Sequence, residues 1–387
     1  NKLRLIKYFS KNLILNLIIK NYLMKKILHI IPNLNNGGAE RSLYLLAKND
    51  HLNEHIVICL SDKGKYGDSL LKHKINVYFL KKNKISLFSY KILDFFLNLV
   101  SLIKSIKPDI VQTWMYNMDI FGGIAARLAG VKIIIWGVRR SSYEPSIMSK
   151  SLLNRIKIAA YLSYFIPTKI VFNSRSGLIN HGLLGYCKKK MLFISNGFDS
   201  LSLDFGPKKD ILKKLLKNQK KTFIIGHVAN FKPEKDHYTL LKSLEYLRKK
   251  NYAFKCILAG RNIDKKNFQL KLLIEKMNLK NHIVLLGEKN DISNLYKSID
   301  LFILSSITEG CNNSLIEAMS HGVPCVATNV GESKYIIGKF GSTVPINKPH
   351  LLANSIEKNL KRLNSSRHNF NSHDIRKRIK DKYSISK

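Results

Sequence analysis

LFILSSITEGCNNSLIEAMSHGVPCVATNVGES, residues 301–333, decides the fold of this chain. Residues 301–304 and 324–328 are short apolar runs, which are typical of buried parallel strands. Between them we expect a polar loop and then a short helix, because residues 312–314 are all good N-cap types and Glu317 would fall in the first turn. In such a strand, loop and helix unit, the free backbone N–H groups at the helix start favour an anion.

Two carboxylates, Glu309 and Glu317, flank this loop and helix start. A carboxylate accepts hydrogen bonds from two adjacent hydroxyl groups, so the pair suits a polyol such as a hexose or a ribose. Gly310 allows a ligand close to the backbone, and Asn313 begins the helix on which a phosphate would rest. The alternative is that Glu317 only favours its helix N-terminus and Glu309 is a solvated loop residue.

The residue pattern of the stretch favours the interpretation that Glu309 and Glu317 bind a polyol. E-G-x-x-N-x-x-x-E-A-M-x-x-G-x-P-x-V-A-T-x-V-G, from Glu309 to Gly331, resembles the E-x7-E signature of the retaining glycosyltransferases called group 1, or family 4. This resemblance implies the GT-B fold, in which two doubly wound Rossmann-like α/β domains face each other across a cleft. The resemblance to this family covers residues 25–383.

The length and the strand pattern agree with two domains. At 387 residues the chain is too long for one ordinary core. Apolar strand-like runs alternate with helical patterns, which favours parallel sheets covered by helices. We predict an N-terminal domain over residues 24–200, where Asn-Gly marks a turn near the end, and a C-terminal domain over residues 201–365. Residues 366–387 would form a basic helix or tail.

Charge and cysteine content restrict the partners and the compartment. Lys and Arg number 66 against 26 Asp and Glu, a formal net charge of +40, so polyanions are expected partners: nucleic acid, an anionic membrane or phosphate-bearing substrates. Codon bias in an AT-rich genome would also explain part of this excess. The five cysteines form no C-x-x-C pair, which disfavours disulfide frameworks and zinc sites and fits a cytoplasmic protein.

Residues 1–23 are basic and apolar, and the apolar run over residues 13–19 is far shorter than the ~20 residues of a spanning helix. Two interpretations are open: a membrane-surface helix, or translated upstream sequence with Met24 as the natural start. We favour the second, because Met24 directly precedes a clean first strand.

The first strand of the N-terminal domain ends in a glycine turn at Gly37 and Gly38, without G-x-G-x-x-G. This disfavours a dinucleotide-binding oxidoreductase. In the resembling family the G-G-A-E turn faces the cleft near donor phosphate and acceptor, which implicates both glycines. Glu40 is expected to be a first-turn helix residue.

Further cleft residues are implied by the segment W-M-Y-N-M-D, similar to W-M-Y-H-A-D of the family. The family histidine is Asn117 here, which argues against a local general base. Asp119 would contact an acceptor hydroxyl or, preferably, cap the following helix. Arg139, in the loop W-G-V-R-R after another strand, would hold phosphate or be solvated, and both readings remain open.

In the C-terminal domain the loop A-N-F-K-P-E-K follows the first strand. The family has an arginine and a lysine here that grip the donor diphosphate. Lys235 matches the lysine, whereas the arginine position is Asn230, and Lys232 would supply the missing charge. Gly260 and Lys289, in the loops after the next two strands, resemble family positions that flank the nucleotide.

The resemblance implies transfer of a hexose-type sugar, with retention, from a nucleotide-diphosphate donor to a glycan or polyprenyl-linked saccharide in polysaccharide, lipopolysaccharide or capsule synthesis. Glu309 and Lys235 would be catalytic, and no covalent nucleophile is needed. No D-x-D occurs, so we expect no metal and no cofactor. We also expect a cytoplasmic enzyme that is peripheral on the anionic inner membrane face, without specific nucleic-acid binding.

Three alternatives remain. An epimerase or phosphorylase can share the architecture. A basic nucleic-acid- or membrane-binding protein would explain the charge, although no nucleic-acid module is recognisable. A catalytically inactive relative is compatible with the departures at Asn117 and Asn230.

Overall fold

The computed structural model describes residues 24–61, 63–80, 90–141, 148–198, 222–289, 292–365 and 370–385. The expected extension over residues 1–23 and the start of the predicted C-terminal domain, residues 201–221, lie outside these ranges. The chain divides into two compact units. The first comprises residues 1–139, 151–172 and 182–192, and the second comprises residues 140–150, 173–181 and 193–387.

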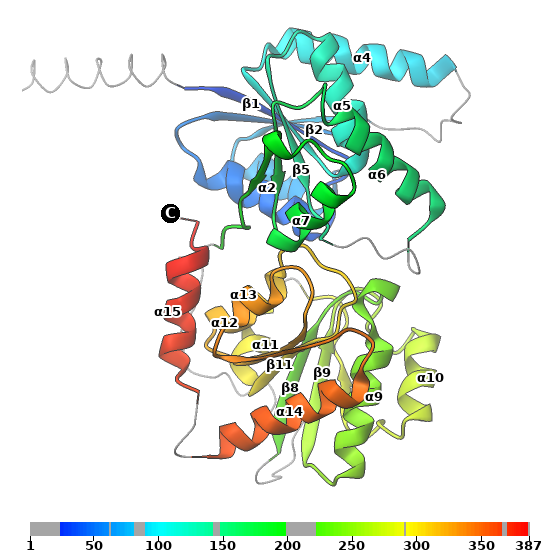
Figure 1. The fold of residues 1–387 in the computed structure, drawn as a ribbon, viewed down its shortest axis with the longest axis vertical. Helices are drawn as coiled ribbons and strands as arrows, with labels where there is room; N and C mark the ends of the chain where they lie inside the picture. Colours follow the sequence, from blue (N-terminus) through cyan, green and yellow to red (C-terminus); the bar gives the residue numbers. More distant parts are fainter. Residues whose placement is uncertain are drawn as a thin grey trace, which may run out of the picture. The chain divides into compact units, whose positions relative to one another are not determined.

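A seven-stranded sheet forms the centre of the first unit (Figure 1). Its strands are β1 Lys26–Ile31, β2 Glu54–Cys59, β3 Asn76–Phe79, β4 Ile110–Trp114, β5 Ile133–Val138, β6 Lys169–Phe172 and β7 Met191–Phe193, in the order β3-β2-β1-β4-β5-β6-β7. The pairings from β3 through β6 are parallel. The order reverses between β1 and β4, so the loops after these two strands diverge at the sheet's carboxyl edge, where ligands bind in open α/β folds.

The helices of the first unit cover both faces of its sheet. They are α2 Gly38–Asn49, α3 Gly64–Lys72, α4 Tyr90–Ile106, α5 Tyr116–Leu128 and α6 Lys150–Leu162, and α7 Arg175–Leu183 runs across the boundary between the units. Ile31 packs in one core cluster with Leu43 of α2 and Leu70 of α3. Its neighbour Ile30 lies against Gly122 of α5, on the opposite face. The sheet is therefore doubly wound.

The second unit contains a six-stranded parallel sheet. Its strands are β8 Phe223–Val228, β9 Phe254–Ala259, β10 Ile283–Leu285, β11 Leu301–Leu304, β12 Cys325–Thr328 and β13 Gly341–Val344, in the order β10-β9-β8-β11-β12-β13. Here the order reverses between β8 and β11. The loops after β8 and β11 therefore flank the point at which a ligand is expected.

The helices of this sheet are α9 His237–Lys249, α10 Phe268–Lys276, α11 Ser293–Ser298, α12 Asn313–Ser320, α13 Ser333–Ile337, α14 Pro349–Asn364 and α15 Ser372–Tyr383. One core cluster joins the sheet to α9, α10 and α14, and the other joins it to α11, α12, α13 and α15. Figure 1 shows α9 and α10 on one side of the sheet and α12 and α15 on the other.

The strands predicted over residues 301–304 and 324–328 are present as β11 and β12. The C-terminal helix is not frayed, because Ile375, Ile379 and Tyr383 are buried in the core cluster of the second unit. All five cysteines are free and buried. No helix in the described part of the chain is long and apolar enough to span a bilayer.

Candidate functional site

An ion pair lies at the reversal point of the second sheet. Lys235 ends the short 3₁₀ helix η3, Pro233–Lys235, in the loop after β8, and Glu309 lies in the loop after β11. Lys235 Nζ is 2.5 Å from Glu309 Oε1. The structure thus brings together the two residues that the sequence analysis named as catalytic. They meet because β8 and β11 are adjacent, so both loops leave the same sheet edge.

Neighbouring serines hold both partners in place. Ser306 Oγ donates to Glu309 Oε1 at 2.7 Å, and Ser305 Oγ donates to the Lys235 carbonyl oxygen at 2.9 Å. The Ile307 N–H donates to the Glu234 carbonyl oxygen, which ties the two loops together by their backbones. The sequence analysis did not identify these two serines. Their position directly after a buried strand, where loop residues often belong to a binding site, could have indicated them.

Two buried histidines lie behind the ion pair. The rings of His227, on β8, and His237, at the start of α9, meet edge to face with centroids 5.0 Å apart. Desolvation lowers the pKa of His227 to about 4 and that of His237 to about 2. Both rings are therefore neutral at pH 7 and place no second positive charge beside Lys235.

Asn230 is fixed by the neighbouring loop. Its side-chain Oδ1 accepts from the Arg261 backbone N–H at 2.9 Å. Gly260 has φ +147°, and a Cβ there would lie 2.2 Å from the Ala229 carbonyl oxygen, so only glycine lets the two loops approach. Lys289 is exposed in the next loop, after β10. These predicted residues therefore lie after three adjacent strands, β8, β9 and β10, and Lys232 precedes Pro233 in the first of the three loops.

Glu317 is not a first-turn residue, and the prediction that it lies there is wrong. The helix α12 begins at Asn313, so Glu317 falls in the second turn. Its side chain is buried, and its Oε2 accepts from the Tyr296 hydroxyl at 2.9 Å. Tyr296 belongs to α11 and was missed by sequence reasoning. The interpretation that Glu317 only favours its helix N-terminus is wrong as well.

The loop before α12 is packed tightly against its surroundings. Asn312 is the N-cap residue, but its side-chain amide donates to Ser333 Oγ at 2.6 Å instead of capping the helix. The Asn313 Oδ1 accepts from Asn196 Nδ2 at 2.9 Å. The Gly310 carbonyl oxygen accepts from the Glu332 N–H, and a Cβ on Gly331 would clash with that oxygen.

In the first unit, the predicted glycine turn forms the start of α2. Gly37 is the N-cap residue and Gly38 the first helical residue. Glu40 lies in the first turn, as predicted. Its carboxylate packs over Gly37 so closely that a Cβ at Gly37 would lie 2.3 Å from Glu40 Oε2.

A polar chain runs below the carboxyl end of β4. Trp114 Nε1 donates to His29 Nδ1 at 3.3 Å, His29 Nε2 lies 2.8 Å from His55 Nδ1, and His55 Nε2 lies 3.1 Å from Asp50 Oδ2. Burial lowers the pKa of His29 to about 3, so the ring is neutral. The Arg139 guanidinium stacks over the Trp114 ring at 4.3 Å. Arg139 is therefore a partly buried side chain packed on Trp114, and phosphate binding by Arg139 stays a prediction.

Asp119 neither caps its helix nor faces solvent. It is fully buried, and its Oδ1 accepts from Thr113 Oγ1 at 2.7 Å and from the Gly137 N–H at 3.3 Å. Burial raises its pKa to about 6, while these hydrogen bonds lower it in part. Asp119 therefore links β4 to β5. Asn117 is exposed on α5, and its Oδ1 accepts from Arg155 at 2.8 Å.

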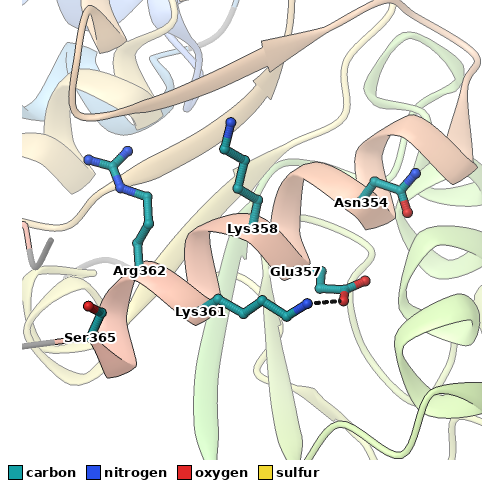
Figure 2. A pocket seen from close by; sticks show the side chains of 6 residues that line it. All are labelled: Asn354, Glu357, Lys358, Lys361, Arg362 and Ser365. Atoms are coloured by element: carbon teal, nitrogen blue, oxygen red, sulfur yellow. Dashed lines mark ion pairs between the residues drawn. The ribbon is translucent and has the colours of Figure 1, made fainter.

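A separate hollow of about 500 Å³ lies along α14. Figure 2 shows its lining residues: Asn354, Glu357, Lys358, Lys361, Arg362 and Ser365. Glu357 is already paired with Lys250 and Lys361, and none of the lining residues belongs to the predicted site. Across the described ranges, no group of three or more His, Cys, Asp and Glu side chains could hold a metal ion. Metal independence stays a prediction.

Comparisons with known sequences match both halves of the chain. Residues 208–375 match the family described as Glycosyl transferases group 1, and residues 40–161 match Glycosyl transferase 4-like. The chain is 30% identical over 251 residues to the UDP-Gal:alpha-D-GlcNAc-diphosphoundecaprenol alpha-1,3-galactosyltransferase of Escherichia coli, an alignment that covers 62% of the chain and 63% of that protein. It is 24% identical over 316 residues to the capsular polysaccharide biosynthesis glycosyltransferase CapH of Staphylococcus aureus, covering 81% and 84%.

Solved structures agree on the fold. Anabaena HepE in complex with UDP and glucose superposes with a TM-score of 0.78 at 19% identity, covering 94% of this chain and 96% of HepE. A glycosyltransferase from Rickettsia africae gives a TM-score of 0.75 at 23% identity, covering 94% and 95%. These likenesses confirm the predicted fold class, two Rossmann-like domains of the GT-B type.

Proposed function

We propose that this chain, which belongs to the group 1 glycosyl transferases, moves a sugar from a nucleotide-diphosphate donor to a hydroxyl group of a glycan or lipid-linked saccharide. The observation that carries the proposal is the Lys235–Glu309 pair between the loops after β8 and β11. It combines a cation for phosphate with a carboxylate for sugar hydroxyls at the position where open α/β sheets bind ligands.

In this proposal each residue acts on one part of the donor. Lys235 stabilises the negative charge that builds on the departing diphosphate, and the N-terminus of α12 near Asn313 adds backbone N–H groups. Glu309 binds hydroxyl groups of the transferred sugar, and Glu317 binds the ribose. Donor binding would have to loosen the contact between Lys235 and Glu309, because both side chains then gain new partners.

The family resemblance supports a proposal for the stereochemical outcome. We propose retention at the anomeric carbon, with a departing phosphate oxygen accepting the proton of the acceptor hydroxyl. This route needs no general base at Asn117, whose amide cannot accept a proton at neutral pH. It requires no metal, because Lys235 and the helix start carry the charge stabilisation.

The names of the relatives suggest the substrate class. HepE has been solved with UDP-glucose, and the Escherichia coli relative uses UDP-Gal on a diphosphoundecaprenol-linked sugar. CapH acts in capsular polysaccharide biosynthesis. We therefore propose a UDP-hexose donor, a polyprenyl-linked saccharide acceptor and a role in cell-surface polysaccharide synthesis at the anionic inner face of the membrane.

A two-stage experiment tests this function. A panel of nucleotide sugars is first screened by thermal shift, since a ligand that binds only the folded protein raises its Tm. The stabilising donor is then incubated with and without lipid-linked saccharides, and released UDP is measured. Acceptor-dependent release supports a transferase. Conversion of the donor sugar without net release indicates an epimerase, and no donor binding at all contradicts the proposal.

A further inference from the structure

The end of α6 and the turn that follows it carry four large apolar side chains on the protein surface. Ile158, Tyr161, Tyr164 and Phe165 are 49%, 69%, 54% and 63% exposed. Isolated exposed apolar residues are normal, but a contiguous group indicates an interaction surface. The opposite side of the same helix, with Ile156, Ala159 and Ala160, is buried.

Three of these side chains form a continuous stripe. Residues 158, 161 and 165 are spaced by three and four positions, which places them on one face of a helix. The rings of Tyr161 and Phe165 lie 5.5 Å apart. The Phe165 N–H donates to the Leu162 carbonyl oxygen, so the helical path continues through the turn.

Exposed lysines lie next to the stripe along the chain and in the neighbouring 3₁₀ helix η2. Lys157 and Lys169 lie before and after it in the chain, and Lys188 and Lys189 lie in η2, Lys188–Lys190. Lys190 Nζ donates to the carbonyl oxygens of Ser163 and Tyr164, at 3.1 and 2.6 Å, which holds η2 against the aromatic turn.

The sequence around these lysines contains no acidic residue. From residue 145 to residue 198 the sequence contains no Asp or Glu and eight Lys or Arg. None of the four exposed lysines forms an ion pair with a described residue. Elsewhere the positive charge is interrupted by carboxylates, as at Glu245 between Lys242 and Lys249, and at Glu357 between Lys250 and Lys361.

We propose that this surface, the aromatic–basic face, docks on an anionic lipid bilayer; it comprises Lys157, Ile158, Tyr161, Tyr164, Phe165, Lys169, Lys188 and Lys189. Tyrosine and phenylalanine side chains settle at the level of the lipid headgroups, and lysines at the rim attract anionic lipids. Ile158 adds an aliphatic group that suits an acyl boundary and has no use in stacking on nucleic-acid bases.

The inference deepens the proposed membrane association, and its test requires no donor or acceptor. The full chain is sedimented with vesicles of phosphatidylcholine alone and with vesicles containing about a third phosphatidylglycerol. Two double variants are compared with it: Tyr161→Ser with Phe165→Ser, and Lys188→Gln with Lys189→Gln. All proteins share residues 1–23, so any contribution of that segment is common to them.

Matched controls come from α10 in the second unit. Phe268 and Leu272 are 73% and 54% exposed there, and Lys265 and Lys266 are exposed beside them. The control pairs are Phe268→Ser with Leu272→Ser, and Lys265→Gln with Lys266→Gln. Because every substituted side chain is exposed, circular dichroism should show unchanged folding in all variants.

We expect binding to the anionic vesicles only. Loss of the two lysines should weaken it about 25-fold, since each contributes roughly fivefold at an anionic surface. Loss of the two aromatic rings should weaken it more than about tenfold, because each buried ring contributes apolar area. The α10 controls should bind as the unsubstituted chain does. Equal binding by the aromatic variant would overturn the inference, whereas absence of vesicle binding by the unsubstituted chain would also overturn the proposed membrane association.

A second readout reports insertion directly. Both native tryptophans, Trp114 and Trp136, are buried, so their emission should not respond to vesicles. A Phe165→Trp variant should show a blue shift with anionic vesicles and quenching by brominated acyl chains. Vesicle-bound protein with an unshifted spectrum would contradict insertion. The double variant Tyr161→Ser with Phe165→Ser is also tested for binding to single-stranded RNA. If it loses RNA binding and keeps vesicle binding, the partner of this face is a nucleic acid instead.

Discussion

The Tyr296 hydroxyl donates a hydrogen bond to Glu317 Oε2 at 2.9 Å, in the interior of the second unit. Tyr296 is 1% exposed, and its ring packs against Phe302 of β11 and His321 at the end of α12. A buried tyrosine usually finds a partner for its hydroxyl, and here the partner is the second carboxylate of the E-x7-E stretch. Tyr296 therefore fixes the orientation of Glu317 from a different helix.

Replacing Tyr296 with phenylalanine should weaken nucleotide binding. A hydrogen bond to a charged group contributes about 1.5–3 kcal/mol, so UDP affinity should fall about tenfold or more. KM for the donor should rise with little change in kcat, because the ribose is remote from the reacting bond. Discrimination against a 2′-deoxyribose donor should also shrink, which titration calorimetry with both nucleotides measures.

The matched control is Tyr252→Phe, since the Tyr252 hydroxyl donates to Glu357 on α14 at 3.1 Å, away from the predicted site. Like Tyr296→Phe, it removes a tyrosine hydroxyl that donates to a glutamate, and it should leave the affinity for both nucleotides unchanged. Equal loss of affinity for the ribose and deoxyribose nucleotides in Tyr296→Phe would indicate a purely structural role for Tyr296.

Much of the fold could be predicted from the sequence because local patterns carry it. The strand Leu301–Leu304 was predicted with its observed bounds, and the first strand predicted after Met24 is β1, since a short apolar run between polar turns is a local signal. The Lys235–Glu309 contact was implied only by the resemblance. No local pattern shows that residues 74 positions apart meet, because that depends on strand order.

The rest could not be predicted because it depends on tertiary packing. Asp119 occupies the first turn of a helix, where a carboxylate normally faces the helix dipole, yet its side chain turns inward to bind Thr113 and Gly137. Tyr296 resembles any core aromatic residue in the sequence. Its role is visible only once α11 and α12 lie on the same face of the sheet.

Removal of either partner of the Lys235–Glu309 pair should abolish most of the transfer. Loss of a preorganised group that stabilises transition-state charge costs about 10²–10³-fold in kcat, which we expect for Lys235→Met. Glu309→Ala should reduce turnover below detection, because the sugar loses its hydroxyl contacts. Steady-state release of UDP in the presence of acceptor measures both.

The control for this pair is Lys242→Met, which breaks the contact of the partly exposed Lys242 with Glu245 at 2.7 Å, on α9. Glu245 keeps its second partner, Lys249, and the contact lies on α9 outside the predicted site, so the activity of Lys242→Met should match that of the unsubstituted enzyme. Unchanged turnover in Glu309→Ala, with an unchanged circular dichroism spectrum, would remove the proposed function.

Replacing Arg175 with methionine should destabilise the second unit. Glu332 is fully buried, and its carboxylate accepts from the Arg175 backbone N–H at 2.5 Å and from the guanidinium at 2.7 Å. Without the guanidinium, the buried Glu332 carboxylate keeps its charge but loses its positively charged partner. We expect the free energy of unfolding to fall by about 2 kcal/mol, less than for a fully buried pair, because Arg175 itself is partly exposed. Tm at pH 7 should fall accordingly.

The fall in Tm caused by Arg175→Met should become smaller as the pH is lowered. Burial already raises the pKa of Glu332 above its ordinary value, and removal of Arg175 should raise it further, so the proton neutralises the carboxylate at a milder pH. Lys63→Met, which breaks an exposed pair with Asp68, should leave Tm unchanged. A Tm difference for Arg175→Met that stays constant between pH 7 and pH 4.5 would contradict this account.

Asp119 should make the folded protein relatively more stable at mildly acidic pH. Its folded pKa is about 6 and its ordinary value is 3.8, so between these two values the folded state binds the proton more tightly than the unfolded state. The contribution of Asp119 to the free energy of unfolding therefore falls by about 3 kcal/mol as pH rises from about 4 to 6. Above this range the contribution is constant.

Asp119→Asn isolates this effect. Asparagine keeps an oxygen that can accept from Thr113 and Gly137 but does not titrate. His29 and His227, whose pKa values are lowered to about 3 and 4, make both proteins less stable below pH 6.5, and their contribution cancels in the comparison. The Tm of the unsubstituted chain minus that of Asp119→Asn should therefore increase as pH falls from 7 to 4.5. A difference that is independent of pH, or that decreases, would show that the Asp119 carboxylate is ionised in the folded protein throughout this range.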